Sequence, residues 1–89
     1  MALLEQRGPM GETPLFVAAL GGHVDVVKLL LEAGADYRSL NNCGQSALHG
    51  AAWAGSVACI RALMAAGANV NAVDARKYTP LLMAVQRRA

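Results

Sequence analysis

A 33-residue internal repeat constrains this chain more than any other feature of its sequence. Residues 11–43 and 44–76 align along their whole length, and a third copy begins at residue 77. Identical residues recur at Gly11 and Gly44, Leu15 and Leu48, Ala18 and Ala51, Ala19 and Ala52, Gly22 and Gly55, Val24 and Val57, Leu30 and Leu63, and the triplets 33–35 and 66–68. A period of this length is typical of solenoid arrays, in which each unit buries its apolar face by stacking on its neighbours.

Each unit predicts two short helices followed by an extended loop. Thr13 is a good N-cap, and Pro14 suits the first helical position because the N–H there has no partner within the helix. The first helix is expected at about residues 14–20, and the second, at about 24–33, carries apolar residues at helical spacing. The polar segment 35–44 that follows is rich in turn-forming residues and suits a projecting hairpin.

The two copies, GETPLFVAALGGHVDVVKLLLEAGAD and GQSALHGAAWAGSVACIRALMAAGANVNAVD, resemble the ankyrin repeat. The resemblance implies an all-α fold, an ankyrin-type α-solenoid of stacked helix-turn-helix units with projecting β-hairpin loops. It divides the chain into a leader or helix remnant (1–10), two full repeats (11–43 and 44–76) and a truncated third repeat (77–89). The chain departs from the family pattern at Gly50, where a larger apolar residue is usual, and we expect lighter packing there.

Composition limits the cellular location and the kinds of partner that we expect for this chain. The chain has 89 residues and a formal net charge of +2, which leaves room for one small domain without the charge of a polyanion-binding protein. Its two cysteines cannot form a disulfide framework, and no apolar run approaches the ~18 residues of a membrane span. Glu5 and Arg7 interrupt the first segment too early for a signal peptide. We therefore expect a cytoplasmic or nuclear protein that does not associate with membranes.

Catalytic and metal-binding patterns are weak. Cys43, Cys59, His23 and His49 are the plausible metal ligands besides carboxylates, but they form no close pair of the kind that binds zinc. Ser46 and His49 lie one helical turn apart, yet the resemblance gives them a capping role, and the sequence indicates no third orienting group. No glycine-rich phosphate-binding motif is present. We expect no enzyme activity, no cofactor and no small-molecule substrate.

The basic residues are scattered, with short pairs at 76–77 and 87–88. A protein that follows a nucleic-acid backbone usually carries a basic stripe with stacking aromatic residues. The pattern therefore disfavours direct binding to nucleic acid. A nucleic-acid-associated regulator remains the alternative from another functional class.

The resemblance implies that another protein binds to the hairpin tips and to the exposed face of the first helices, which line a concave surface. The two copies differ most at these positions, as when Leu20 aligns with Trp53. The candidate partner-binding residues are Leu20, Asn42, Cys43, Gln45, Trp53, Asp74, Arg76 and Tyr78. Trp53 is the main candidate for a binding hot spot, since Trp, Tyr and Arg are enriched in hot spots. The alternative is a structural Trp packed on its own helix pair.

Two further hypotheses rest on the resemblance. The surroundings of Asn71 are similar to the site at which an asparaginyl hydroxylase modifies ankyrin repeats, whereas the alternative is that Asn71 only forms hydrogen bonds within its hairpin. The expected function is a non-catalytic scaffold for protein–protein interaction. Its alternative is a fragment or short variant of a larger ankyrin array, such as the substrate receptor of a ubiquitin ligase.

Overall fold

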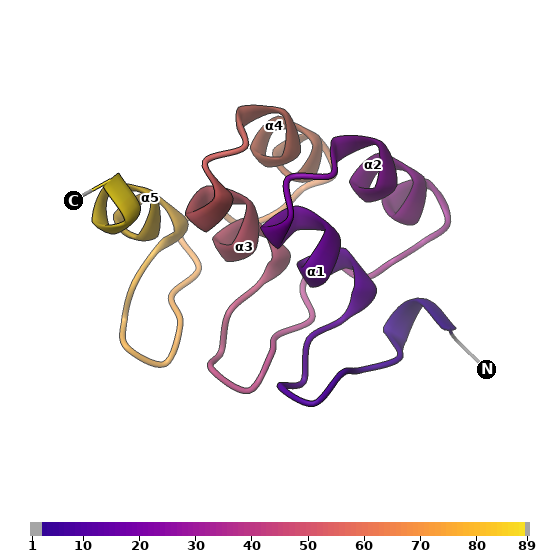
Figure 1. The fold of residues 1–89 in the computed structure, drawn as a ribbon, viewed down its shortest axis with the longest axis horizontal. Helices are drawn as coiled ribbons and strands as arrows, with labels where there is room; N and C mark the ends of the chain where they lie inside the picture. The colour runs from indigo at the N-terminus through magenta and orange to yellow at the C-terminus, as the bar shows by residue number, and fades with distance from the viewer. Residues whose placement is uncertain (1–2, 89) are drawn as a thin grey trace.

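The computed structural model describes residues 3–88 and contains stacked helix pairs joined by long loops (Figure 1). α1, α3 and α5 lie side by side in one layer, α2 and α4 form a second layer above α1 and α3, and three loops project in the same direction away from that second layer (Figure 1). This arrangement confirms the all-α repeat fold. The elements are η1 (Leu3–Glu5, a 3-10 helix), α1 (Pro14–Leu20), α2 (Val24–Glu32), α3 (Ala47–Ala54), α4 (Val57–Ala65) and α5 (Pro80–Arg88).

The same hydroxyl cap begins the first helix of every repeat. Thr13 Oγ1 accepts a hydrogen bond of 3.2 Å from the Phe16 N–H at the start of α1. Ser46 Oγ accepts from the His49 N–H at the start of α3, and Thr79 Oγ1 accepts from the Leu82 N–H at the start of α5. Each cap satisfies an N–H group that lacks an intrahelical partner, which confirms the predicted helix starts.

Small residues allow α1 and α3 to approach each other closely. Ala18, Ala19, Ala51 and Ala52 are all buried between the helices of neighbouring repeats. Ala18, Ala19 and Ala51 belong to an apolar core that continues into the second helices. The members of the core cluster are Leu15, Ala18, Ala19, Val27, Ala35, Ala47, Leu48, Ala51, Cys59 and Leu63.

The expectation of lighter packing at Gly50 was wrong. Gly50 is buried, and a Cβ atom there would lie 3.3 Å from both the Cε1 atom and the carbonyl oxygen of Phe16. The Phe16 ring therefore occupies the space in which a larger residue at position 50 would place its side chain. At this point α1 lies against the backbone of α3.

The three loops are tight turns, and no β-strand occurs in residues 3–88, so the expected β-hairpins are present without strand pairing. Single backbone hydrogen bonds join neighbouring loops, from the Asn42 N–H to the Met10 carbonyl oxygen and from the Ala75 N–H to the Cys43 carbonyl oxygen, each 3.0 Å long. The loops are thus ordered by their neighbours as well as by their own turns.

Residues 8–12 form the same turn as the two later loops. The Gly8 N–H donates to the Glu12 carbonyl oxygen at 2.8 Å. The equivalent bonds, 33 and 66 residues further on, close residues 41–45 and 74–78 at 2.9 Å each. The structure therefore extends the repeat pattern back to residue 8, into the segment that the sequence comparison set apart.

One position of this turn requires a left-handed backbone. Gly11 and Gly44 both have φ of 75°, and Lys77, at the equivalent position of the third turn, has φ of 70°. A side chain in this region costs about 1–2 kcal/mol, because its Cβ crowds the following carbonyl oxygen. The third turn therefore carries a local strain that the first two avoid.

We predict that Lys77→Gly stabilises the protein by about 0.5–1 kcal/mol, since the relief of left-handed strain exceeds the entropy that glycine adds to the unfolded chain. Urea unfolding followed by circular dichroism measures the change. The matched substitution Gly44→Ala should destabilise the protein, because its Cβ would lie 3.0 Å from the Ala75 nitrogen. A Lys77→Gly variant less stable than the wild type would contradict the strain argument.

Candidate functional site

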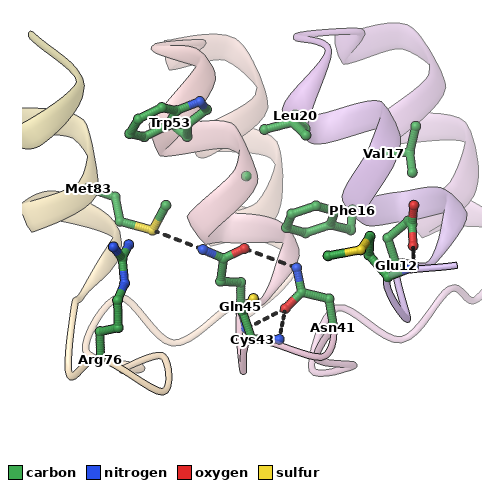
Figure 2. Close-up of a pocket in the computed structure, with 12 residues that line it drawn as sticks. Glu12, Phe16, Val17, Leu20, Asn41, Cys43, Gln45, Trp53, Arg76 and Met83 are labelled. Carbon is green, nitrogen blue, oxygen red and sulfur yellow. Dashed lines mark hydrogen bonds between the residues drawn. The ribbon is translucent and has the colours of Figure 1, made fainter. Parts of the chain in front are cut away.

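A groove of about 510 Å³ runs between the first helices and the loops, and we call it the loop-side groove (Figure 2). Its walls come from α1 and α3, with one residue from α5 and several from the loop tips. The residues that line it are Met10, Glu12, Phe16, Val17, Leu20, Asn41, Cys43, Gln45, Gly50, Trp53, Arg76 and Met83.

Five of the eight candidate partner-binding residues lie in the loop-side groove, namely Leu20, Cys43, Gln45, Trp53 and Arg76. Trp53 and Leu20 each have 41% of their surface exposed, so more than half of each side chain is covered. In Figure 2 both side chains lie at the helical end of the groove, away from the loop tips. The groove thus has an apolar end on the helices and a more polar end at the loops.

Asn42 and Tyr78 lie outside the lining of the loop-side groove. Asn42 is exposed at a loop tip, where its N–H bonds to the preceding loop. Tyr78 contacts Arg76, whose Cζ atom lies 4.6 Å from the centre of the Tyr78 ring. A cation over an aromatic face at this distance is attracted to it. Tyr78 therefore supports a residue of the groove without lining it.

Asn41 and Gln45 fix the middle loop. Asn41 Oδ1 accepts from the N–H groups of Cys43 and Gln45 at 2.9 Å each, and Asn41 Nδ2 donates to Gln45 Oε1 at 3.0 Å (Figure 2). Gln45 Nε2 also lies 4.0 Å from Met83 Sδ on α5. These contacts fix the middle loop and connect it to α5 at the polar end of the groove.

Asp74 corrects one site prediction, because it is buried and unavailable to a partner. Only 5% of its surface is exposed, and its Oδ1 accepts from the N–H groups of Arg76 at 2.8 Å and Tyr78 at 2.9 Å. Burial raises the pKa of Asp74, but the N–H donors of Tyr78 and Arg76, together with the Arg76 charge, outweigh it and hold the pKa below its ordinary value. Asp74 closes its turn as Asn41 closes the turn before it.

We predict that Asp74→Ala destabilises the protein by about 1–3 kcal/mol, because two N–H groups lose their acceptor. Asp74→Asn should cost much less, since Asn41 forms both bonds at the equivalent position. Because the native pKa of Asp74 lies below the unfolded value of 3.8, its stabilisation is complete above that pH and is lost as pH falls through the native pKa.

Urea unfolding at pH values from 7 to below 3 tests this expectation. The wild type should lose stability below about pH 4 more steeply than Asp74→Asn, which has no carboxylate to protonate. Parallel acid profiles for the two proteins would contradict the role assigned to the carboxylate.

Ser46 and His49 form a structural cap. The Ser46 N–H donates to His49 Nδ1 at 3.1 Å, so Nδ1 is an acceptor and Nε2 carries the proton. Nε2 donates in turn to the Tyr78 carbonyl oxygen at 2.9 Å, and His49 is fully buried. This histidine ties the second repeat to the third loop and has no ring nitrogen left to activate a nucleophile.

The remaining site predictions concern metals, membranes and Asn71. Among residues 3–88, no three His, Cys, Asp or Glu side chains group closely enough to hold a metal ion, and no helix is long and apolar enough to cross a bilayer.

Asn71 is exposed outside the loop-side groove, and its N–H donates to Asn69 Oδ1 at 2.9 Å. This bond within the turn favours the alternative in which Asn71 has only a structural role. We therefore expect tandem mass spectra of protein from animal cells to show no added oxygen on Asn71, and the mass of one added oxygen there would support hydroxylation instead.

A family model for ankyrin repeats, built from three copies, matches residues 2–74. The chain belongs to the ankyrin-repeat family. Ankyrin repeats are protein-interaction modules, so the family accounts for a surface of the kind described here.

Several known ankyrin-repeat proteins are similar to parts of the chain. The human Notch-regulated ankyrin repeat-containing protein is 48% identical over 42 residues, which are 47% of this chain and 37% of that protein. The probable E3 ubiquitin-protein ligase XBOS33 of Oryza sativa is 58% identical over 36 residues, 40% of this chain and 7% of the ligase. XBAT33, an E3 ubiquitin-protein ligase of Arabidopsis thaliana, matches to the same extent. The chain thus spans well under two thirds of the length of these relatives.

Sequence reasoning missed several groove residues, and the 33-residue spacing could have found them. Val17, Gly50 and Met83 occupy the same repeat position, as do Met10 and the predicted Cys43 and Arg76. Met10 lies before residue 11, where the sequence comparison begins the first repeat, so it was not compared with Cys43 and Arg76. The missed lining residues are Met10, Glu12, Phe16, Val17, Asn41, Gly50 and Met83.

Proposed function

We propose that the chain is a non-catalytic scaffold that binds an extended segment of a partner protein in the loop-side groove. The observation that carries this proposal is the convergence of variable repeat positions in a single groove, with Leu20 and Trp53 from the helices and Arg76 from a loop tip. Positions that differ between otherwise similar repeats can set specificity without altering the stacking that forms the fold.

The helical end of the groove suits one apolar side chain of the partner. Phe16 contributes an apolar ring at the base of the groove, where it packs against the backbone of Gly50. Leu20 and Trp53 lie at this end of the groove on neighbouring helices (Figure 2). An aromatic side chain that borders an apolar groove is a frequent hot spot, because a bound apolar group would exclude water from both surfaces.

Charge gives the loop-side groove a direction. Glu12 lies at the end of the groove beside α1, and Arg76 at the end beside α5 (Figure 2). A partner segment with an acidic residue on the α5 side of its apolar anchor fits this arrangement. An ion pair between Arg76 and this acidic residue would affect the orientation and association rate of the partner more than its affinity, because the Arg76 side chain is 65% exposed.

The fixed loops favour binding with little entropic cost. The turns at 41–45 and 74–78 are closed by backbone bonds and by the side chains of Asn41 and Asp74. A site whose side chains are already held in place loses less conformational freedom when a partner binds. This supports rigid-scaffold recognition as the mechanism.

A second candidate function is substrate capture within a larger ubiquitin-ligase array. The likeness to XBOS33 and XBAT33, both named as E3 ubiquitin-protein ligases, favours it. In that setting the repeats would hold the substrate, and catalysis would lie elsewhere. The loop-side groove would serve both roles, so the same binding experiment tests it.

We predict that Trp53→Ala weakens binding by about 2 kcal/mol, or roughly thirtyfold, since truncation of a hot-spot Trp removes its contact with the partner. The ligands are peptides selected from a random display library on the wild-type protein, and fluorescence anisotropy measures their affinity. The circular dichroism spectrum of Trp53→Ala should remain helical. Loss of the fold in that variant would assign Trp53 to the structural alternative.

Two variants control this experiment. Val57→Ala removes an apolar side chain that is 59% exposed on α4 outside the loop-side groove, and it should leave peptide affinity unchanged. Arg76→Gln should abolish any preference for an acidic residue beside the apolar anchor. Equal affinities for Trp53→Ala and Val57→Ala would rule out the loop-side groove as the binding site.

A further inference from the structure

Two polar side chains from different loops face the α5 side of the loop-side groove. Gln45 belongs to the middle loop and Arg76 to the third loop, and both line the groove. Figure 2 shows the Gln45 amide and the Arg76 guanidinium pointing from their loops toward Met83 on α5. Because this pair lies in the loop-side groove, any ligand assigned to it rests on the proposed function.

Hydrogen bonds of the middle loop fix which atom of the Gln45 amide faces α5. Asn41 Oδ1 accepts the N–H groups of Cys43 and Gln45, so the other amide atom of Asn41 is the nitrogen. This nitrogen donates to Gln45 Oε1 at 3.0 Å, which turns Gln45 Nε2 the other way, to 4.0 Å from Met83 Sδ. A thioether sulfur is a weak acceptor. Gln45 Nε2 therefore has no strong acceptor within residues 3–88.

Two neighbours hold the Arg76 guanidinium in place. Its Cζ atom lies 4.6 Å from the centre of the Tyr78 ring, and its Nη2 atom lies 3.9 Å from Asp74 Oδ2. Both neighbours attract the cation, but the second distance is too long for a hydrogen bond. Among residues 3–88, the hydrogen bond that Arg76 donates comes from its backbone N–H. The five N–H groups of the guanidinium are therefore available to a ligand.

We propose that Gln45 Nε2 and the Arg76 guanidinium together bind the side-chain carboxylate of an aspartate or glutamate in the partner segment. The carboxylate accepts from the flat fork of Arg76, whose geometry it matches, and from Gln45 Nε2. For Gln45, a charged oxygen replaces the weak sulfur acceptor of Met83. Donors from two neighbouring loops thus fix the acidic residue of the partner beside α5.

A carboxylate fits this pair better than a phosphate. Asp74 Oδ2 lies behind the guanidinium and is buried without a hydrogen-bond partner within residues 3–88, so its charge offsets part of the Arg76 charge. Of the described residues that line the groove, only Arg76 is cationic. A phosphate monoester carries about 1.5–2 negative charges at pH 7. Its second charge would face Asp74 with no further cation to balance it.

The probes are peptides selected from the random display library on the wild-type protein, with both termini blocked so that only a side chain can supply the carboxylate. An acidic residue should recur at one fixed spacing from the apolar anchor. Replacement of this residue by its amide should weaken binding about fivefold, because a charged acceptor forms stronger hydrogen bonds than a neutral one. Fluorescence anisotropy measures both affinities, and their ratio is the preference for the acidic peptide.

Gln45→Glu isolates the contribution of the amide donor. The new carboxylate can still accept from Asn41 Nδ2 and keep the turn, but it donates no hydrogen bond and repels an acidic partner. The preference for the acidic peptide should disappear, while the affinity for the amide peptide should not fall. Asn42→Asp is the matched control, because it makes the same amide-to-carboxylate change on the same loop outside the lining of the groove. It should keep the preference.

Tyr78 has a positioning role that a second pair of variants tests. Tyr78→Leu removes the aromatic face under Arg76 and should lower the preference for the acidic peptide, whereas Tyr78→Phe keeps the face and should retain the preference. A purely structural role of Tyr78 would instead lower the affinities for the acidic and amide peptides equally. Circular dichroism spectra should show that both variants remain helical.

Four results would overturn the proposal: selected peptides without a recurring acidic residue, equal affinities for the acidic and amide peptides, a preference that survives Gln45→Glu, or tighter binding when phosphoserine replaces the acidic residue. Each of them leaves the proposed function standing as long as Trp53→Ala weakens peptide binding. Failure of the proposed function would appear differently, as equal peptide affinities for Trp53→Ala and Val57→Ala.

Discussion

The contact between α1 and α3 is the interaction on which the rest of the structure depends. No repeat can bury its own apolar face, so the core forms only where neighbouring helix layers meet. Burial of a leucine stabilises a protein by about 1.5–3 kcal/mol, and Leu15 and Leu48 are both fully covered. That coverage requires Ala19 and Gly50 to be small, since a larger residue at either place would hold the layers apart.

The loops depend on this stacking, and through them so does the loop-side groove. The second and third loops each bond to the loop before them, and His49 joins a buried cap on α3 to the third loop. The repeat period then brings residues 33 positions apart in the sequence side by side on one surface. Specificity can vary at Trp53 or Arg76 while the caps and core that position them stay the same.

The sequence predicted the helices well because a cap and an apolar period are local signals. Thr13, Ser46 and Thr79 cap helices as their spacing indicated. The turns were harder to predict. Gly8, Asn41 and Asp74 are chemically different residues at one repeat position, so no identity marked them as equivalent. In the first turn Gly8 has no side chain to accept the N–H of Met10. The Glu12 carboxylate accepts this N–H instead, at 2.7 Å.

The loop-side groove was predicted only in part. The predictions for Asp74 and Gly50 were wrong because they depend on contacts that the local sequence does not show. A polar residue at a loop tip can face a partner or bond to its own turn, and composition does not distinguish the two, which is why Asp74 was assigned to the surface. At Gly50 the missing side chain indicated a loss of packing. The structure shows that the space beside Gly50 is filled by the Phe16 ring of the neighbouring helix. Phe16 occupies the repeat position at which the next repeat has the capping residue His49, so the repeat pattern did not reveal this contact.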